Sequence, residues 1–235
     1  MLFRITILCL FTFSTIGLFA QNKFSYGIEL GNGYSKLGLN TSSELYKSKE
    51  NNWKGMDITF SGKQTLSLAL NVEYQLLNKL RLGIGAGYHS WGGKVKTVNY
   101  NPQFLYSASD LDIYYQSLEF PLYLKIIFLQ KNRFNFYVSG GYGLMHTFRD
   151  HFYLLDGYLP GEFNSKVNFD TYFIRLALGT EIKLKHQSYF TIGFSYSTDT
   201  YNNHSRIHDF EDFWGLGKIP LNYKAINFNL GVKFH

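Results

Sequence analysis

The run from Gln64 to Leu76 alternates strictly between apolar and polar positions, and this period constrains the fold more than any other feature. The odd-numbered positions are polar or small. The even-numbered positions from 66 onward are Leu66, Leu68, Leu70, Val72, Tyr74 and Leu76. A period of two residues places the two sets on opposite faces of a β-strand. The run is long enough to cross a bilayer as a tilted strand.

Similar alternation recurs to the end of the chain and predicts eight strands in all. The predicted strands are Lys23–Gly31, Gln64–Leu76, Leu80–Ser90, Tyr114–Leu129, Phe134–Met145, Thr171–Leu184, Tyr189–Thr198 and Tyr223–Phe234. The tight connections are Leu77–Lys79, Gln130–Arg133 and Lys185–Ser188, and the long ones are Asn32–Lys63, Trp91–Ile113, His146–Asp170 and Asp199–Asn222. Short turns that alternate with long loops are typical of outer-membrane barrels, in which the long loops face outward.

The sequence therefore predicts an all-β fold, namely an eight-stranded antiparallel up-and-down transmembrane β-barrel. An even number of strands places both termini in the periplasm and the long loops outside the cell. A soluble lipocalin-type barrel would point its apolar parity inward, and a soluble sandwich would have one wet face on each sheet. Here the polar parity, meaning the set of alternate strand positions that are polar, is rich in Gly, Ser and Ala. These residues fit the crowded interior of a narrow barrel. The large apolar parity is therefore expected to face lipid.

The first 20 residues have the features of a secretory signal. Arg4 supplies the positive charge, Ile5–Phe13 is a short apolar core, and the predicted cleavage separates Ala20 from Gln21. The apolar run is too short for an N-terminal membrane anchor, which is the alternative interpretation. The predicted organisation is a signal peptide over residues 1–20 and one barrel domain over residues 21–235.

Composition excludes several other functions. Cys9 is the only cysteine and leaves with the signal, so the mature chain is expected to have no disulfide or thiol chemistry. Aromatic residues make up 19% of the chain, as the aromatic girdles of membrane barrels require. The net charge is +6, but we see no basic helix or RNA-binding motif, and an exported chain has little access to nucleic acid. Basic loops that contact anionic lipopolysaccharide are the favoured explanation.

Charged residues of both signs lie on the parity predicted to face the barrel lumen. They are Glu29, Glu73, Arg81, Glu119, Lys125, Arg175, Glu181 and Lys183. Isolated charges in a narrow lumen would be costly, so we expect ion pairs, including one between Glu73 and Arg81 across the first tight turn. A salt-bridged plug without a stable large pore is favoured. A conductance path or a proton relay is the alternative.

The segment Gln116–Lys125 reads Q-S-L-E-F-P-L-Y-L-K. This segment resembles the signature of the PorT-type outer-membrane β-barrel family of Gram-negative bacteria. The motif residues are Leu118, Glu119, Phe120, Pro121, Leu122 and Lys125. The resemblance extends to the F-A-Q junction, to Tyr137–Gly143 and to Leu230–Phe234, and so spans the mature chain. It implies an outer-membrane barrel, and it allows an accessory role in a protein-secretion system, because PorT itself assists one.

Two details of this resemblance carry structural expectations. Proline lacks a donor, so we expect a bulge or a broken ladder bond at Pro121. The alternating C-terminal residues Phe228, Leu230, Val232 and Phe234 resemble the signal that the barrel insertion machinery reads, although His235 follows the terminal aromatic residue.

Catalytic and metal-binding patterns are weak, and we predict neither an enzyme nor a cofactor. A lipid-A deacylase would need His and Ser on the same strand face, whereas His89 and Ser90 are adjacent. His204 and His208 lie near Asp residues in the last long loop, which leaves a rim enzyme or a metal site as an alternative. No H-E-x-x-H, G-x-S-x-G or phosphate-loop motif is present.

The long loops contain the aromatic residues most suited to recognition, namely Trp53, Tyr201, Phe213 and Trp214. The favoured function is a non-enzymatic, plugged outer-membrane barrel that serves as a structural or partner-binding component. A secretion accessory and a small pore or ligand binder are the alternatives. Expected partners are outer-membrane lipid, lipopolysaccharide and the insertion machinery, together with secretion proteins if the accessory role holds.

Overall fold

The structure is a computed structural model that describes residues 23–39, 56–99, 108–154, 161–165, 169–184, 187–200 and 221–235. The predicted signal peptide and its cleavage site at Ala20 and Gln21 lie outside these residues. Within the described part of the chain, no helix is long and apolar enough to cross a membrane.

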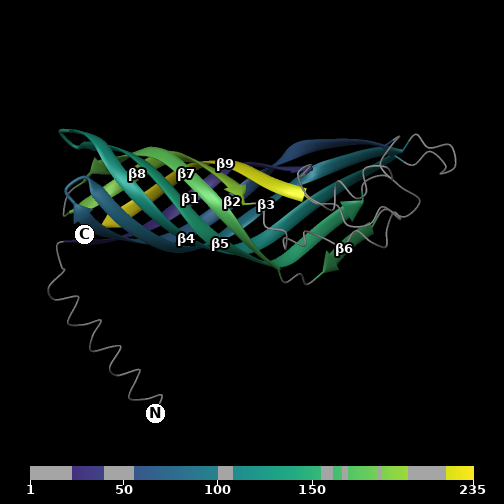
Figure 1. Ribbon diagram of the computed structural model, residues 1–235, viewed down its shortest axis with the longest axis horizontal. Coiled ribbons are helices and arrows are strands. Elements are labelled where there is room, and N and C mark those ends of the chain that lie inside the picture. Colours follow the sequence, from purple (N-terminus) through teal and green to yellow (C-terminus); the bar gives the residue numbers. More distant parts are fainter. Residues whose placement is uncertain are drawn as a thin grey trace, which may run out of the picture.

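Eight antiparallel strands close into a barrel, which Figure 1 shows from the side. They are β1 (Phe24–Leu39), β2 (Met56–Leu77), β3 (Leu80–Asn99), β4 (Ala108–Lys131), β5 (Phe134–Leu154), β7 (Phe169–Lys183), β8 (Ser188–Asp199) and β9 (Leu221–Phe234). Each strand pairs with its neighbours in the chain, and the pairing of β1 with β9 completes the ring. The predicted eight-stranded up-and-down barrel is therefore confirmed.

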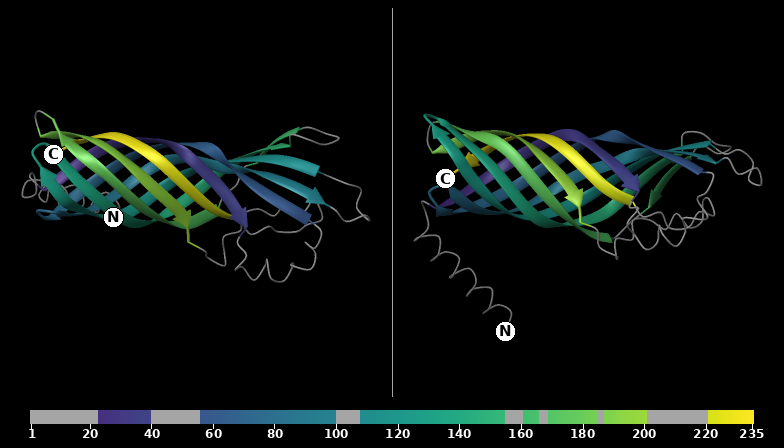
Figure 2. Two further views of the ribbon diagram at one scale, coloured as in Figure 1. Left: turned by 90° about the horizontal axis from the view of Figure 1, so that it is seen from above. Right: turned by 45° about the horizontal axis from the view of Figure 1, so that its top comes forward.

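A ninth strand, β6 (Gly161–Ser165), was not predicted and does not belong to the closed barrel. It pairs with the end of β5, from Asp150↔Ser165 to Leu154↔Gly161. Figure 2 shows this hairpin extending beyond the barrel at the end opposite the C-terminus.

The tight connections lie at the end of the barrel that holds the C-terminus. We call this end the turn side and the opposite end the loop side. The pairs Leu77↔Leu80 and Lys131↔Phe134 close the β2–β3 and β4–β5 hairpins. Asn132 and Gln187 have φ angles of 53° and 58° in the β4–β5 and β7–β8 turns. Asn tolerates this left-handed conformation well, as a short turn requires.

Strand ends were predicted well on the turn side and poorly on the loop side. The predicted loops Asn32–Lys63, Trp91–Ile113 and His146–Asp170 are wrong in extent, because large parts of them are strand. The ladder between β3 and β4 continues outward to Val98↔Ala108. Strands β2 to β5 are 20 to 24 residues long, whereas β7 to β9 have 12 to 15. One side of the barrel wall is therefore much taller than the other.

The two faces of the wall have the predicted polarity. Every barrel strand exposes large apolar side chains on its outer face, such as Ile28 on β1, Leu70 on β2 and Leu176 on β7. Buried charged and polar side chains point inward, and the lumen is narrow. The Tyr137 ring lies so close to Gly179 that a Cβ atom at this glycine would come within 2.6 Å of the phenol oxygen. Small residues on the inner parity thus leave room for the large ones.

Pro121 interrupts one of its two ladders. Toward β5 the pairing runs without a break through Pro121↔Gly143. Toward β3 it stops between Ile84↔Leu122 and Gly87↔Glu119, and resumes in the same register. The expected broken ladder is therefore confirmed. No bulge forms, since the register is unchanged.

Candidate functional site

The turn-side half of the lumen holds a cluster of five charged side chains from five strands. Arg81 Nη1 donates to both oxygens of Glu181 at 3.0 and 2.8 Å, and its distance to Glu73 Oε2 is 3.5 Å. Lys125 contacts Glu73 directly and lies 3.3 Å from Glu181. Lys233 contacts Glu181 directly and lies 3.2 Å from Glu73. All five side chains are buried, so the cluster satisfies charges that water cannot reach.

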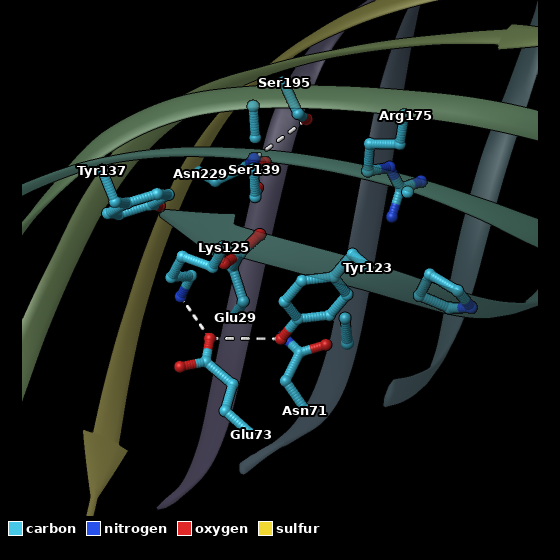
Figure 3. Close-up of a pocket in the computed structure, with 14 residues that line it drawn as sticks. Glu29, Asn71, Glu73, Tyr123, Lys125, Tyr137, Ser139, Arg175, Ser195 and Asn229 are labelled. Atoms are coloured by element: carbon cyan, nitrogen blue, oxygen red, sulfur yellow. Dashed lines mark hydrogen bonds and ion pairs between the residues drawn. The ribbon is translucent and has the colours of Figure 1, made fainter. Parts of the chain in front are cut away.

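Three cations and two carboxylates give this cluster a surplus of one positive charge. Glu29 lies in the next layer and makes no ion pair or hydrogen bond with the described residues. It lines a cavity of about 70 Å³ together with Asn71, Tyr123 and Lys125. Figure 3 shows Glu29 and Lys125 on this cavity, with the Tyr123 hydroxyl donating to Glu73 at 3.2 Å. The cavity is large enough for a few water molecules.

A second charged cluster lies nearer the loop side. Glu119 accepts from Arg175 Nη2 at 2.5 Å and lies 2.6 Å from His89 Nδ1. Arg175 Nε also donates to Ser197 Oγ at 2.9 Å. His89 is fully buried, and its Nε2 has no hydrogen-bond partner among the described residues. Glu119 therefore serves as the shared acceptor that ties β4 to β3 and β7 across the lumen.

An aromatic layer lies beyond this second cluster. Trp91 stacks on Tyr115 with ring centroids 4.3 Å apart and lies 4.7 Å from Tyr223. The indole N–H of Trp91 donates to Ser117 Oγ at 2.8 Å, and Ser117 is in turn 2.8 Å from Thr147 Oγ1. These aromatic rings are fully buried, so they fill this level of the lumen with apolar surface.

The structure brings together most, but not all, of the predicted charges. Glu73, Arg81, Lys125 and Glu181 form the turn-side cluster, and Glu119 and Arg175 form the second one. The predicted contact between Glu73 and Arg81 exists, although Glu181 is the closer partner of Arg81.

Lys183 was predicted to join these charges, but it lies exposed at the end of β7 and takes no part in either cluster. Lys233 occupies the position in the turn-side cluster that had been expected for Lys183. The alternation of β9 had already put Lys233 on the polar parity, which was the available signal. His89 was also missed, because its pairing with Glu119 joins residues 30 positions apart.

The six motif residues within Leu118–Lys125 each have a structural explanation. Leu118, Phe120 and Leu122 are exposed on the outer face of β4. Glu119 and Lys125 supply buried lumen charges, and Pro121 lines the cavity between them. The motif is therefore accounted for by the construction of the barrel wall.

Some predicted residues show no site in the described structure. The aromatic residues Trp53, Tyr201, Phe213 and Trp214, and the histidines His204 and His208, lie outside the described residues. Within the described ranges, no group of three or more His, Cys, Asp or Glu side chains is arranged to hold a metal ion. The C-terminal residues Phe228, Leu230 and Phe234 are exposed on the outer face of β9, and Val232 is half-buried there.

The chain is similar to several solved outer-membrane proteins, all at low sequence identity. No protein family matches the chain, and no curated protein is similar in sequence. Among solved structures, Neisserial surface protein A is 12% identical, covers 89% of this chain and 96% of its own, with a TM-score of 0.46. Outer membrane protein OprG from Pseudomonas aeruginosa is 13% identical, with coverage of 91% and 96% and a TM-score of 0.45. The outer membrane protease OmpT from Escherichia coli is 13% identical, with coverage of 91% and 96% and a TM-score of 0.47.

Proposed function

We propose that this chain is an integral protein of a bacterial outer membrane, with its lumen filled by side chains. In this proposal it acts without catalysis, as a structural or partner-binding component. The observation that carries the proposal is the inverted distribution of polarity: large apolar side chains cover the outside, and ion pairs fill the inside. Soluble proteins rarely expose a continuous apolar surface beyond several hundred square ångströms. A closed barrel is one of the two structures that satisfy all backbone hydrogen bonds in lipid.

The aromatic residues of the outer face support a membrane-spanning orientation. On the turn side, Tyr26, Phe128, Phe134 and Phe234 are exposed. On the loop side, the exposed aromatic residues are Tyr34, Tyr142, Phe148, Tyr172 and Tyr196. The exposed side chains between the two sets are mostly aliphatic, such as Leu70 and Leu178, and Phe120, Phe194 and Phe228 lie among them. Aromatic girdles on both sides of an aliphatic band are typical of barrels that cross a membrane.

The arrangement of the lumen supports a plug in preference to a pore. The turn-side ion cluster, the Glu119 cluster and the aromatic layer follow one another along the barrel axis. The cavity lined by Glu29 between these layers has a volume of about 70 Å³, which is far too small for a continuous aqueous channel. In this proposal the protein therefore serves a structural role or binds partners, and solutes do not pass through its lumen.

The tall side of the wall favours partner binding as the more specific role. Strands β2 to β5 extend past the shorter strands at the loop side, and β6 widens this extension. In the proposed orientation the termini are periplasmic, so this extension faces the outside of the cell. The expected partners are lipid and lipopolysaccharide, with the insertion machinery needed for assembly. Membership of a secretion system remains a second proposal, which rests on the resemblance of Leu118–Lys125 to the PorT-type signature.

Insertion into lipid and electrical conductance test the proposal together. The chain without residues 1–20 would be refolded into phospholipid vesicles and run on gels with and without boiling. We expect a heat-dependent change in mobility and no porin-size steps in planar bilayers. A chain that stays soluble and monomeric without lipid or detergent would contradict the membrane assignment. Large, stable single-channel steps would contradict the plugged lumen.

A further inference from the structure

Five exposed basic side chains surround the turn-side end of the barrel. They are Lys23, Lys79, Lys131, Arg133 and Lys183. Backbone hydrogen bonds fix several of them to the rim: Lys79 O accepts from Ile127 N at 2.8 Å, and Arg133 O accepts from Lys183 N at 2.7 Å. These residues therefore belong to the ordered end of the wall. Figures 1 and 2 show this end, where the C-terminus lies.

No described carboxylate neutralises this basic rim. None of the five side chains forms an ion pair with another described residue. Apart from the terminal carboxylate at His235, which pairs with none of the five, the carboxylates closest to this end are Glu73 and Glu181. Both are buried in the lumen and are already outnumbered by their own cations. The turn side thus presents a surplus of positive charge over the described part of the chain. At the loop side both signs occur, with ion pairs such as Lys63–Asp112 at 2.6 Å.

The basic rim borders directly on the apolar outer surface. Leu129 lies two residues before Lys131 and is 48% exposed. Phe134 directly follows Arg133 and is 43% exposed. Leu77, two residues before Lys79, is 65% exposed. The turns are too short to project far beyond this apolar edge. Long basic side chains at such a boundary extend toward the headgroup region of a bilayer.

We propose that the turn-side rim binds the phosphate groups of anionic phospholipids in the adjoining leaflet. This inference rests on the proposed function, because it requires the apolar outer face to lie in lipid. The height of the rim favours lipid over a protein partner, since the cations lie at the level of the headgroups. Each basic residue near an anionic membrane surface strengthens binding by about fivefold at low ionic strength, so three together should produce a clear preference.

Lipid selectivity of matched charge variants tests the proposal. The refolded chain would be placed in phosphatidylcholine vesicles with spin-labelled phosphatidylglycerol or spin-labelled phosphatidylcholine. The motionally restricted fraction of each label measures its binding to the barrel. The test variant is K79Q/K131Q/R133Q. The control K36Q/R149Q/K224Q also removes two lysines and one arginine, but from exposed positions near the loop side.

We expect the wild-type barrel to prefer phosphatidylglycerol several-fold, and the preference to weaken as salt is added. The turn-side variant should lose most of this preference, and the loop-side control should keep it. The absence of a preference in the wild type would overturn the inference, as would equal losses in both variants. Insertion into pure phosphatidylcholine separates the two proposals: a barrel that inserts without lipid preference overturns only this inference, whereas failure to insert overturns the proposed function as well.

Discussion

The two ends of the lumen, which lie on either side of the Glu119 cluster, are filled by different chemistry. On the turn side, Glu73 and Glu181 share three cations in a buried cluster. On the loop side, Trp91 stacks on Tyr115 and contacts the tilted ring of Tyr223, and the one described hydrogen bond of its indole is with Ser117. Ion pairs satisfy charges but depend on every member, because removing one leaves the others buried and unpaired. Aromatic packing depends on shape and loses stability more gradually.

This difference predicts that the turn-side half is the more sensitive to single substitutions. Its five members come from β2, β3, β4, β7 and β9, so the cluster also ties together strands that are distant in sequence. The aromatic layer ties together β3, β4 and β9 through ring contacts. The predictions that follow measure how far this contrast holds.

The largest expected effect comes from Glu181→Ala. The substitution leaves Arg81, Lys125 and Lys233 with Glu73 as their one remaining carboxylate in the cluster. We expect the free energy of unfolding to fall by about 3–5 kcal/mol, the usual cost of breaking a buried ion pair. Urea titration of the barrel refolded in vesicles measures it.

Lys183→Ala is the matched control for Glu181→Ala, because it removes a charge two residues away on the same parity of β7. Lys183 is exposed and outside the cluster, so the change should stay within about 0.5 kcal/mol. Equal losses for the two variants would show that the ion cluster does not determine stability.

A smaller effect is expected from Trp91→Phe in the aromatic layer. The phenyl ring keeps much of the stacking on Tyr115 but loses the hydrogen bond to Ser117 and part of the buried volume. We expect a loss of about 1–3 kcal/mol by the same titration. A loss as large as that of Glu181→Ala would remove the contrast between the two halves.

The smallest effect is expected from Pro121→Ala. Alanine restores a backbone N–H at the gap between β3 and β4, and it also makes the unfolded chain more flexible. These contributions oppose each other, so the net change should lie within about 1 kcal/mol. Slower amide hydrogen exchange at position 121 than at exposed loop positions would show that the gap has closed. A loss beyond 2 to 3 kcal/mol, on the scale of about one buried side chain, would mean that the proline ring is a packing element of the lumen.

The sequence was sufficient for the barrel and its two faces, because an apolar outer face and a packed polar lumen impose strict alternation. It was insufficient for the loop-side ends of β2 to β5. In the proposed membrane orientation both faces of a strand meet water beyond the lipid, so alternation weakens there. Bulges between Gly62 and Leu66, and between Gln116 and Ser117, also break the period.

The candidate site was predicted only in part, because alternation identifies inward-facing residues but not which of them meet. Alternation shows which charges point inward, so Glu73, Arg81 and Glu181 were found. It does not show the height of each strand relative to the others, which is set by the register of the closed barrel. Lys183 and Lys233 lie on the same parity as the cluster, yet only Lys233 reaches it. His89 and Glu119 meet for the same reason, through the β3–β4 register.

The most direct test of the central claim is a cysteine scan along β7, from Leu176 to Thr180. Cys9 is the only natural cysteine and lies in the predicted signal, so each introduced thiol would be unique in the mature chain. Spin labels on the refolded barrel would be exposed in turn to oxygen, which partitions into lipid, and to a water-soluble nickel complex. The account predicts high oxygen accessibility at Leu176, Leu178 and Thr180, and low accessibility to both reagents at Ala177. Gly179 is left unchanged, because a side chain there would collide with Tyr137. Access of the nickel complex to the even-numbered positions, or the inverse alternation, would contradict a lipid-facing exterior.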